Sequence, residues 1–164
     1  MLVFLCKFLL ILDFLIDRNV ANGKKDTTNP VENTCLLCIC QAITSCNPLE
    51  KCEPDDKRYG PCYITEEYWK DAGGKGEDFK ICVNNFDCTN KTIQRYIEIN
   101  SVDCNNNGRL ECGDYFLIHS YGKDDCYHSY IEETPSWLRF LECYLNQVSN
   151  PRDVLENLIF NRNV

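Results

Sequence analysis

Apolar side chains recur at helical spacing through the middle of the chain. Phe79, Cys82, Val83 and Phe86 stand at positions i, i+3, i+4 and i+7, which is the spacing of one helix face, and the pattern continues through 92–99. We therefore expect a mainly helical chain. Further short helices are expected at 113–120, 136–147 and 153–160. Thr134 and Pro135 form a helix start signal before the second of these, and the third is amphipathic.

One short strand and several irregular segments complete the expected elements. Tyr63-Ile64-Thr65 is the best strand candidate, and the glycine-rich residues 71–78 are typical of a surface loop. The polar residues 24–34 predict a flexible lead-in, residues 35–146 one compact domain, and residues 147–164 a C-terminal tail. Together these elements predict a small α+β domain with a mostly helical body.

The N-terminal residues predict a secretory signal peptide. Residues 1–16 are almost entirely apolar, Lys7 stands near the start, and Ala21-Asn22-Gly23 follow. The run is short and carries Asp13, which speaks against a membrane-spanning helix. We therefore expect cleavage after about residue 23 and a secreted, extracellular protein with no membrane contact afterwards.

The thirteen cysteines become an even set of twelve when Cys6 leaves with the signal peptide. Extracellular proteins of this size commonly pair such a set, so about six disulfides are expected. A zinc site is the weaker alternative, because Cys35-x2-Cys38 has no second copy and the chain has only two histidines. The cysteines expected in disulfides are Cys35, Cys38, Cys40, Cys46, Cys52, Cys62, Cys82, Cys88, Cys104, Cys112, Cys126 and Cys143.

The composition limits the classes of partner that the protein is expected to bind. A net charge of −8 and a pI of about 4.8 argue against a nucleic-acid partner. Hydrophobic residues make up 44% of the chain, which is enough for a core. Trp69 and Trp137 are expected in that core, although Tyr63, Tyr68 and Trp69 would also suit a groove in which sugars stack. We expect a monomer.

Several motifs, in the same order along the chain, resemble the invertebrate-type (i-type) lysozymes, also called the destabilase family. The resemblance covers about residues 35–143 and is closest to the insect-like branch, which lacks the cysteines that other members carry where this chain has Ala72 and Thr92. The matching segments are 35–46, Gly60-Pro61 with 63–65, Tyr68-Trp69 with 71–73, 82–88, 92–96, 112–114, Ile118-His119 and Cys126.

The resemblance implies a lysozyme-like, disulfide-rich α+β fold with a small β-element. It also implies peptidoglycan or a related glycan as partner, in antibacterial defence (innate immunity) or digestion. Glycoside hydrolysis needs two carboxyl groups, one of which donates a proton. In active family members the proton donor is a glutamate in a Cys-x-x-Glu-x-x-Cys segment. Here that segment runs from Cys40 to Cys46 and Ile43 holds the glutamate's place. Muramidase catalysis is therefore expected to be lost.

The second carboxylate of the family has two candidates here. Counting forward from Cys52 selects Asp55, and counting back from Cys62 selects Asp56. An exposed acidic turn is the favoured interpretation of these residues, because most acidic side chains lie at the surface. The alternative function, an active lysozyme, would need a relocated acid, for which the candidates are Glu50, Glu53 and Glu66.

A second alternative function is a destabilase-type isopeptidase, which the family is credited with through a serine and a histidine. His119 matches the histidine, but residues 55–62, where the serine would fall, contain none. Ser120 and Ser129 lie elsewhere in the sequence, and neighbours in sequence do not form a catalytic pair by default. A structural, hydrogen-bonded His119 is therefore the favoured interpretation.

Two further motifs do not depend on the resemblance. Residues 103–114 follow the twelve-residue EF-hand loop, with a glycine at the sharp turn. The expected Ca²⁺ ligands are Asp103, Asn105, Asn107, Arg109 (through its carbonyl) and Asp114. The alternative is an Asn-Gly turn between two disulfide-bonded cysteines. Asn90-Lys91-Thr92 is an N-glycosylation sequon, and Asn90 is its acceptor.

Overall fold

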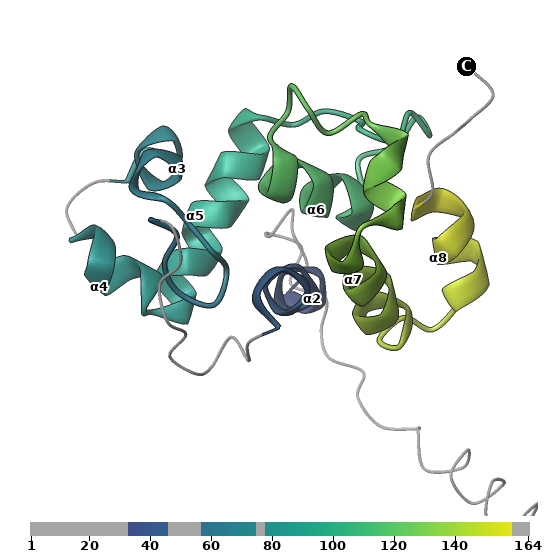
Figure 1. Ribbon diagram of the computed structural model, residues 1–164, viewed down its shortest axis with the longest axis horizontal. Helices are drawn as coiled ribbons and strands as arrows, with labels where there is room; N and C mark the ends of the chain where they lie inside the picture. Colours follow the sequence, from purple (N-terminus) through teal and green to yellow (C-terminus); the bar gives the residue numbers. More distant parts are fainter. Residues whose placement is uncertain (1–32, 46–56, 75–77, 159–164) are drawn as a thin grey trace, which may run out of the picture.

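The computed structural model describes residues 33–45, 57–74 and 78–158 of the 164-residue chain. Nearly all regular structure in these ranges is helical (Figure 1). No helix in them combines the length and apolarity needed to cross a membrane. The elements are α2 (Asn33–Thr44), α3 (Glu66–Asp71), α4 (Phe79–Val83), α5 (Phe86–Ile99), α6 (Cys112–Tyr121), the 3₁₀ helix η1 (Ser129–Glu133), α7 (Pro135–Leu145) and α8 (Pro151–Leu158).

Helix α2 lies at the centre of the molecule. In Figure 1 it is seen nearly end-on, with α5 on one side and α7 on the other. Its buried residues include Leu36, Ile39 and Ala42 as well as three cysteines. The sequence analysis predicts no helix here, because residues 35–40 form a continuous apolar run and the exposed stripe of the helix includes the apolar Leu37, so the sequence shows no clear amphipathic period.

The helices expected from periodicity are confirmed, with one break. The apolar pattern over 79–99 is split into α4 and α5, because the Asn85 side chain accepts a hydrogen bond from the Cys88 N–H and begins a new helix. The segments expected at 113–120, 136–147 and 153–160 form α6, α7 and α8. Thr134 accepts from the Trp137 N–H and Pro135 occupies the first turn of α7, so the predicted start signal acts as one.

The prediction of a strand at 63–65 is wrong, although the backbone does pair with another segment at this place. Within the described residues it contributes one isolated antiparallel bridge, in which Tyr59 and Ile64 exchange N–H···O bonds of 2.9 and 3.1 Å. The turn between them is too tight for a ladder. Gly60 has φ +70°, and a Cβ there would lie 2.2 Å from the Val83 carbonyl oxygen, so only glycine fits.

Five disulfides link the described cysteines, which confirms the disulfide interpretation for ten of the expected twelve. Cys46 and Cys52 lie outside the described residues. The bridges are Cys35–Cys112, Cys38–Cys143, Cys40–Cys62, Cys82–Cys88 and Cys104–Cys126.

An aromatic cluster forms the middle of the core. Phe116 of α6 stacks on Phe140 of α7 with ring centroids 4.7 Å apart, and Trp137 meets Phe116 edge-on at 5.4 Å. Trp137 is only 1% exposed, which confirms its expected place. Trp69 is partly buried at the edge of the core, 6.0 Å from the ring of Phe79.

Helix α8 is a packed part of the domain. Leu158 at its end is 1% exposed and belongs to the core cluster. It lies over Gly113, where an added Cβ would come within 2.8 Å of a Leu158 methyl group. The tail expected at 147–164 therefore contains a docked helix, which lies beside α7 in Figure 1.

Candidate functional site

A cleft of about 480 Å³ opens where the end of α2 meets the 58–65 turn, α3, α6 and the start of α7. It brings together residues that the sequence singles out at widely separated positions. Hydroxyl groups and aromatic rings dominate its described lining. The lining residues are Ile43, Arg58, Tyr63, Thr65, Tyr68, His119, Ser120, Tyr121 and Ser136.

Ile43 lies on the last turn of α2 and forms part of the cleft wall. Its position is fixed by two links between α2 and the neighbouring turn. The Cys40–Cys62 disulfide is one link, and the Thr44 hydroxyl, 3.0 Å from the Pro61 carbonyl oxygen, is the other. The residue that the sequence analysis aligns with the family's proton donor is therefore an apolar side chain held at the edge of a cleft.

The other carboxylate candidates do not complete an acid–base pair in the described structure. Glu66 is exposed on α3, where its carboxylate lies 2.7 Å from the Lys70 ammonium, and it does not line the cleft. Asp55 and Asp56, like Glu50 and Glu53, lie outside the described residues. Among the described lining residues there is no Asp or Glu.

His119 is held by hydrogen bonds at both ring nitrogens. Nε2 lies 2.9 Å from the Cys62 carbonyl oxygen and Nδ1 lies 2.9 Å from the Tyr68 hydroxyl. A carbonyl only accepts, so Nε2 carries the proton and Nδ1 accepts from Tyr68. Burial lowers the pKa of His119 to about 4, although the bond to the Cys62 carbonyl opposes this shift. The imidazole is therefore neutral and hydrogen-bonded at both nitrogens, so it cannot act as a base toward Ser120 or Ser129.

Tyr68 connects His119 to helix α5. Its ring stacks on Tyr96 with centroids 3.7 Å apart. Burial, with a smaller contribution from Tyr96, raises the pKa of Tyr68 well above its usual value, so its hydroxyl stays protonated and donates to His119. This contact supports the structural interpretation of His119.

The sequence analysis missed four residues of the cleft, of which Thr65 was expected only as part of a strand. Arg58 lies over the Tyr63 ring, with 4.8 Å from the guanidinium carbon to the ring centroid. Tyr121 and Ser136 face the cleft from the end of α6 and the start of α7. No local pattern marks these positions, because they come together only when α2, α6 and α7 pack. The one hint in the sequence that any of these residues lines the cleft is the position of Arg58 next to the turn at Gly60.

Acidification is expected to destabilise the protein through His119. Between about pH 6.5 and 4 the unfolded chain binds a proton that the folded His119 does not, so the free energy of unfolding falls as the pH is lowered through this window. The loss from this group reaches at most about 3 kcal/mol. Urea denaturation at several pH values should show less destabilisation on acidification for His119→Gln than for the parent, or even a gain in stability, because the buried Asp114 carboxyl, whose pKa is raised to about 6, acts in the opposite direction. His128→Gln should keep the parental profile. An unchanged slope in His119→Gln would contradict the assignment.

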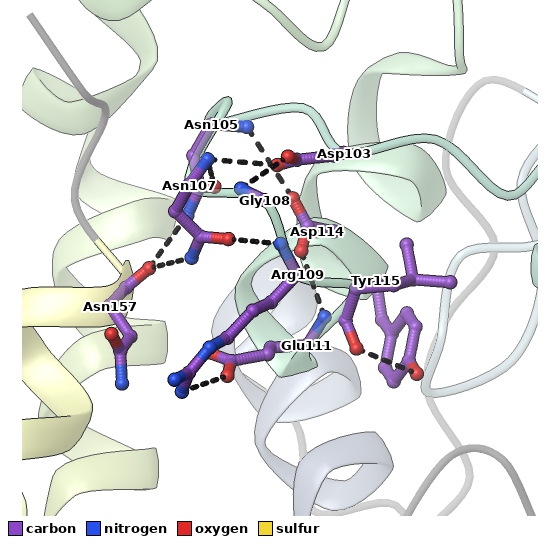
Figure 2. Close-up of polar contacts among 10 residues, drawn as sticks. Asp103, Asn105, Asn107, Gly108, Arg109, Glu111, Asp114, Tyr115 and Asn157 are labelled. Carbon is purple, nitrogen blue, oxygen red and sulfur yellow. Dashed lines mark hydrogen bonds and ion pairs between the residues drawn. The ribbon is translucent and has the colours of Figure 1, made fainter.

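The loop of 103–111, which matches the EF-hand pattern, is closed by its own side chains (Figure 2). The Asp103 carboxylate accepts from the Asn107 and Gly108 N–H groups at 3.2 and 2.7 Å. Asn107 Oδ1 accepts from the Arg109 N–H at 2.8 Å. Gly108 takes φ +83°, as the sharp turn requires. These bonds give the loop the tight, oxygen-rich turn that the sequence predicts.

Asp114 closes the loop from the first turn of α6. One of its oxygens accepts from the Cys104 N–H at 2.9 Å and the other from the Glu111 N–H at 2.9 Å. Burial raises the pKa of Asp114 to about 6, against the effect of these backbone donors. Its effect on stability is opposite in sign to that of His119. The folded state binds a proton more tightly, so this contribution is present below about pH 4 and is lost as the pH rises through 6.

The two loop asparagines also bind helix α8. Asn105 Nδ2 donates to the Asn157 carbonyl at 2.8 Å, and Asn107 Nδ2 donates to the same oxygen (Figure 2). An aspartate at either position would place a carboxylate against carbonyl oxygens. The structure thus gives a reason for asparagine at these two positions that does not involve a metal.

Calcium binding at this loop stays a prediction. Site occupancy is expected to raise the melting temperature at millimolar Ca²⁺, and a chelator to reverse the rise. The Asp103→Asn variant serves as a control, because it removes a charge from the predicted ligands and keeps an acceptor for the loop turn. The same melting temperature with and without Ca²⁺ would contradict the prediction.

The sequon lies in the middle of α5. Asn90 is partly buried and its Nδ2 donates to Asn33 Oδ1 at 3.3 Å, while the Thr92 hydroxyl donates to the Cys88 carbonyl at 2.9 Å. Glycosylation of Asn90 stays a prediction, and the mass of the protein from a eukaryotic host before and after glycosidase treatment tests it.

Comparison with known proteins gives consistent matches. Residues 32–143 match the family model described as Destabilase. A lysozyme of Magallana gigas is 34% identical over 116 residues, which are 68% of this chain and 77% of the relative. An invertebrate-type lysozyme of Ruditapes philippinarum is 29% identical over 116 residues, or 68% of this chain and 82% of the relative.

Solved structures share the fold. The inhibitor-bound lysozyme from Meretrix lusoria has a TM-score of 0.54 and 27% identity, over 68% of this chain and 89% of that one. The Tapes japonica lysozyme has a TM-score of 0.52 and 26% identity, over 72% of this chain and 91% of that one. The lysozyme-like, mostly helical and disulfide-rich fold expected from the sequence is confirmed.

Proposed function

Because the chain belongs to the destabilase family of invertebrate-type lysozymes, we propose that it is a secreted member that binds peptidoglycan or a related glycan without hydrolysing it. Its role would be extracellular, in defence or digestion. The position of Ile43 in the cleft wall carries this proposal. An isoleucine has no proton to give to the leaving oxygen of a glycosidic bond, and general acid–base catalysis contributes about 10²–10⁴-fold to rate.

The rest of the cleft favours retained binding. Tyr63 and Tyr121 offer aromatic surface for a sugar ring, and Thr65 and Ser136 offer hydroxyls for its polar edge. The volume of about 480 Å³ falls in the range of small-molecule sites. Loss of the acid removes the chemical step and leaves these groups in place.

Neither alternative function gains support from the described residues. A relocated acid would have to reach the cleft, and Glu66 is instead paired with Lys70 on the exposed side of α3. An isopeptidase would need a histidine able to take a proton from a serine, and both nitrogens of His119 are engaged by Cys62 and Tyr68.

A paired binding and lysis experiment tests the proposal. The purified protein is expected to sediment with insoluble peptidoglycan and to leave the turbidity of a bacterial cell-wall suspension unchanged, while a bivalve lysozyme clears it. Robust clearing by the unmodified protein would overturn the loss of catalysis, and absence of sedimentation would overturn glycan binding. Release of lysine from a γ-glutamyl-lysine substrate would instead support the isopeptidase.

Two matched variants sharpen the result. Ile43→Glu supplies the missing acid, and Ile43→Gln has nearly the same size and no acid. Clearing by Ile43→Glu alone would show that the remaining machinery still works once a proton donor is supplied. Equal clearing by both variants would mean that the missing acid at position 43 is not the reason for inactivity.

A further inference from the structure

A second pocket, of about 380 Å³, lies between the end of α2 and the second half of α7, two helices that pack side by side (Figure 1). It shares no described lining residue with the cleft. The two hollows are neighbours, because Ile43 and Ser136 line the cleft while Gln41 and Arg139, each within one turn of them on the same helices, line the pocket. The proposed function makes no use of this pocket.

The walls of the pocket are fixed to each other. The Cys38–Cys143 disulfide joins α2 to α7, and Cys143 itself lines the pocket. Arg139 Nε donates to the Ala42 carbonyl at 2.8 Å, which holds the guanidinium against the last turn of α2. No other hydrogen bond or ion pair of Arg139 occurs among the described residues. Its terminal amino groups are therefore positioned and still have donors to give.

The other polar groups of the pocket also have unused hydrogen-bonding capacity. Glu142 stands one turn beyond Arg139 on α7, yet no ion pair joins the two in the described structure. The side-chain amides of Asn146 and Gln147 likewise have no partner among the described residues. The pocket thus combines a guanidinium, a carboxylate and two amides, none of which is saturated by the protein.

This combination matches one kind of ligand better than others. No aromatic ring occurs in the described lining, so the stacking surface that a sugar ring uses is missing. A simple anion would meet the Glu142 carboxylate, and a metal ion would meet the Arg139 guanidinium. A peptide with a carboxylate and an ammonium group suits both charges, and side-chain amides can donate to and accept from its peptide groups.

We infer that this pocket binds a short peptide carrying both a carboxylate and an ammonium group, with Arg139 pairing with the carboxylate and Glu142 with the ammonium. The inference goes beyond the proposed glycan binding and does not require it. Such a peptide has two sources, a free peptide and a peptide attached to a cell-wall glycan. The short distance along α2 and α7 between pocket and cleft suits a wall fragment that occupies both.

Calorimetric titration of the purified, disulfide-bonded protein with three probes tests the inference. The probes are the tripeptide alanyl-γ-glutamyl-lysine, the same peptide with its amino groups acetylated and its carboxyl groups amidated, and a cell-wall disaccharide that carries the tripeptide. At low salt the charged tripeptide is expected to bind 10-fold or more tightly than the blocked one, and its affinity should fall as salt rises. Tighter binding of the disaccharide-tripeptide identifies wall fragments as the source, and equal binding identifies free peptide.

Variants assign the preference to the two charges. Glu142→Gln and Arg139→Gln are each expected to weaken binding of the charged tripeptide 5-fold or more and to change that of the blocked one less than 2-fold, with Arg139→Lys in between. Arg152→Gln and Glu156→Gln remove the same charges from exposed positions on α8 and should leave the affinities unchanged. Circular dichroism and melting temperature establish that each variant is folded. Glu142→Gln carries the test if Arg139→Gln unfolds, because Glu142 has no described side-chain partner to lose.

The outcomes separate the two proposals. Equal affinity for the charged and blocked tripeptides, a charge preference that survives Glu142→Gln, or no binding of either peptide by the folded parent would overturn the peptide site. Sedimentation with glycan strands stripped of their peptides decides the glycan proposal independently, because those strands carry nothing for this pocket.

Discussion

Replacing Cys35 and Cys112 together by alanine is expected to lower the free energy of unfolding by between about 3 and 4 kcal/mol. This bridge ties the start of α2 to the start of α6 across 77 residues of sequence. In the unfolded chain the other bridges already shorten the path between its ends to roughly 30 residues, by way of Cys38–Cys143 and Cys104–Cys126. Loop-closure entropy for a loop of that size gives the stated range.

The Cys82–Cys88 bridge is the matched control. It closes a loop with a sequence separation of 6, for which the same reasoning gives about 2 kcal/mol. Paired alanine substitution avoids leaving a free thiol in either variant. Urea denaturation of the parent and both variants measures the difference. A larger loss for Cys82/Cys88 than for Cys35/Cys112 would contradict the entropic account and indicate that local packing decides.

The parts of the fold that sequence predicts are those with a local cause. Helices α5 and α7 have one apolar face and recognisable start residues, Asn85 and Thr134, and both were found where periodicity places them. Helix α2 escaped prediction because residues 35–40 form a continuous apolar run, and the exposed stripe of the helix carries the apolar Leu37 between Asn33 and Gln41, which hides the period. The strand at 63–65 was overpredicted, because β-propensity at Tyr63 and Ile64 says nothing of a partner longer than one residue pair.

The site shows the same division. The spacing of the cysteines aligns Ile43 with the family's proton donor, so this match needs no coordinates. The structure places Ile43 at a cleft. The environment of His119 could not be read in this way, because Cys62 and Tyr68 come from segments more than 50 residues away. The same holds for Asn105 and Asn107, whose amides meet the end of α8 only after that helix docks.

Trp137→Ala is expected to cost between about 3 and 5 kcal/mol of stability, the range for removing a fully buried large aromatic side chain. Trp137 is 1% exposed and packs against both Phe116 and Phe140, with ring centroids 5.4 Å from each. Its loss opens a cavity where α6 and α7 meet, and the paired helices cannot close it without breaking the neighbouring ring contacts.

Trp69, the other of the two tryptophans, provides the matched comparison. It is partly buried, and its ring lies against Phe79 and the backbone of Gly74, where an added Cβ would come within 2.3 Å. Its replacement by alanine is expected to cost about 1–2 kcal/mol, because water can reach the space left behind. Denaturation followed by circular dichroism compares the two variants without relying on tryptophan fluorescence. Equal losses would mean that the edge of the core around Trp69 is packed as tightly as the aromatic cluster around Trp137.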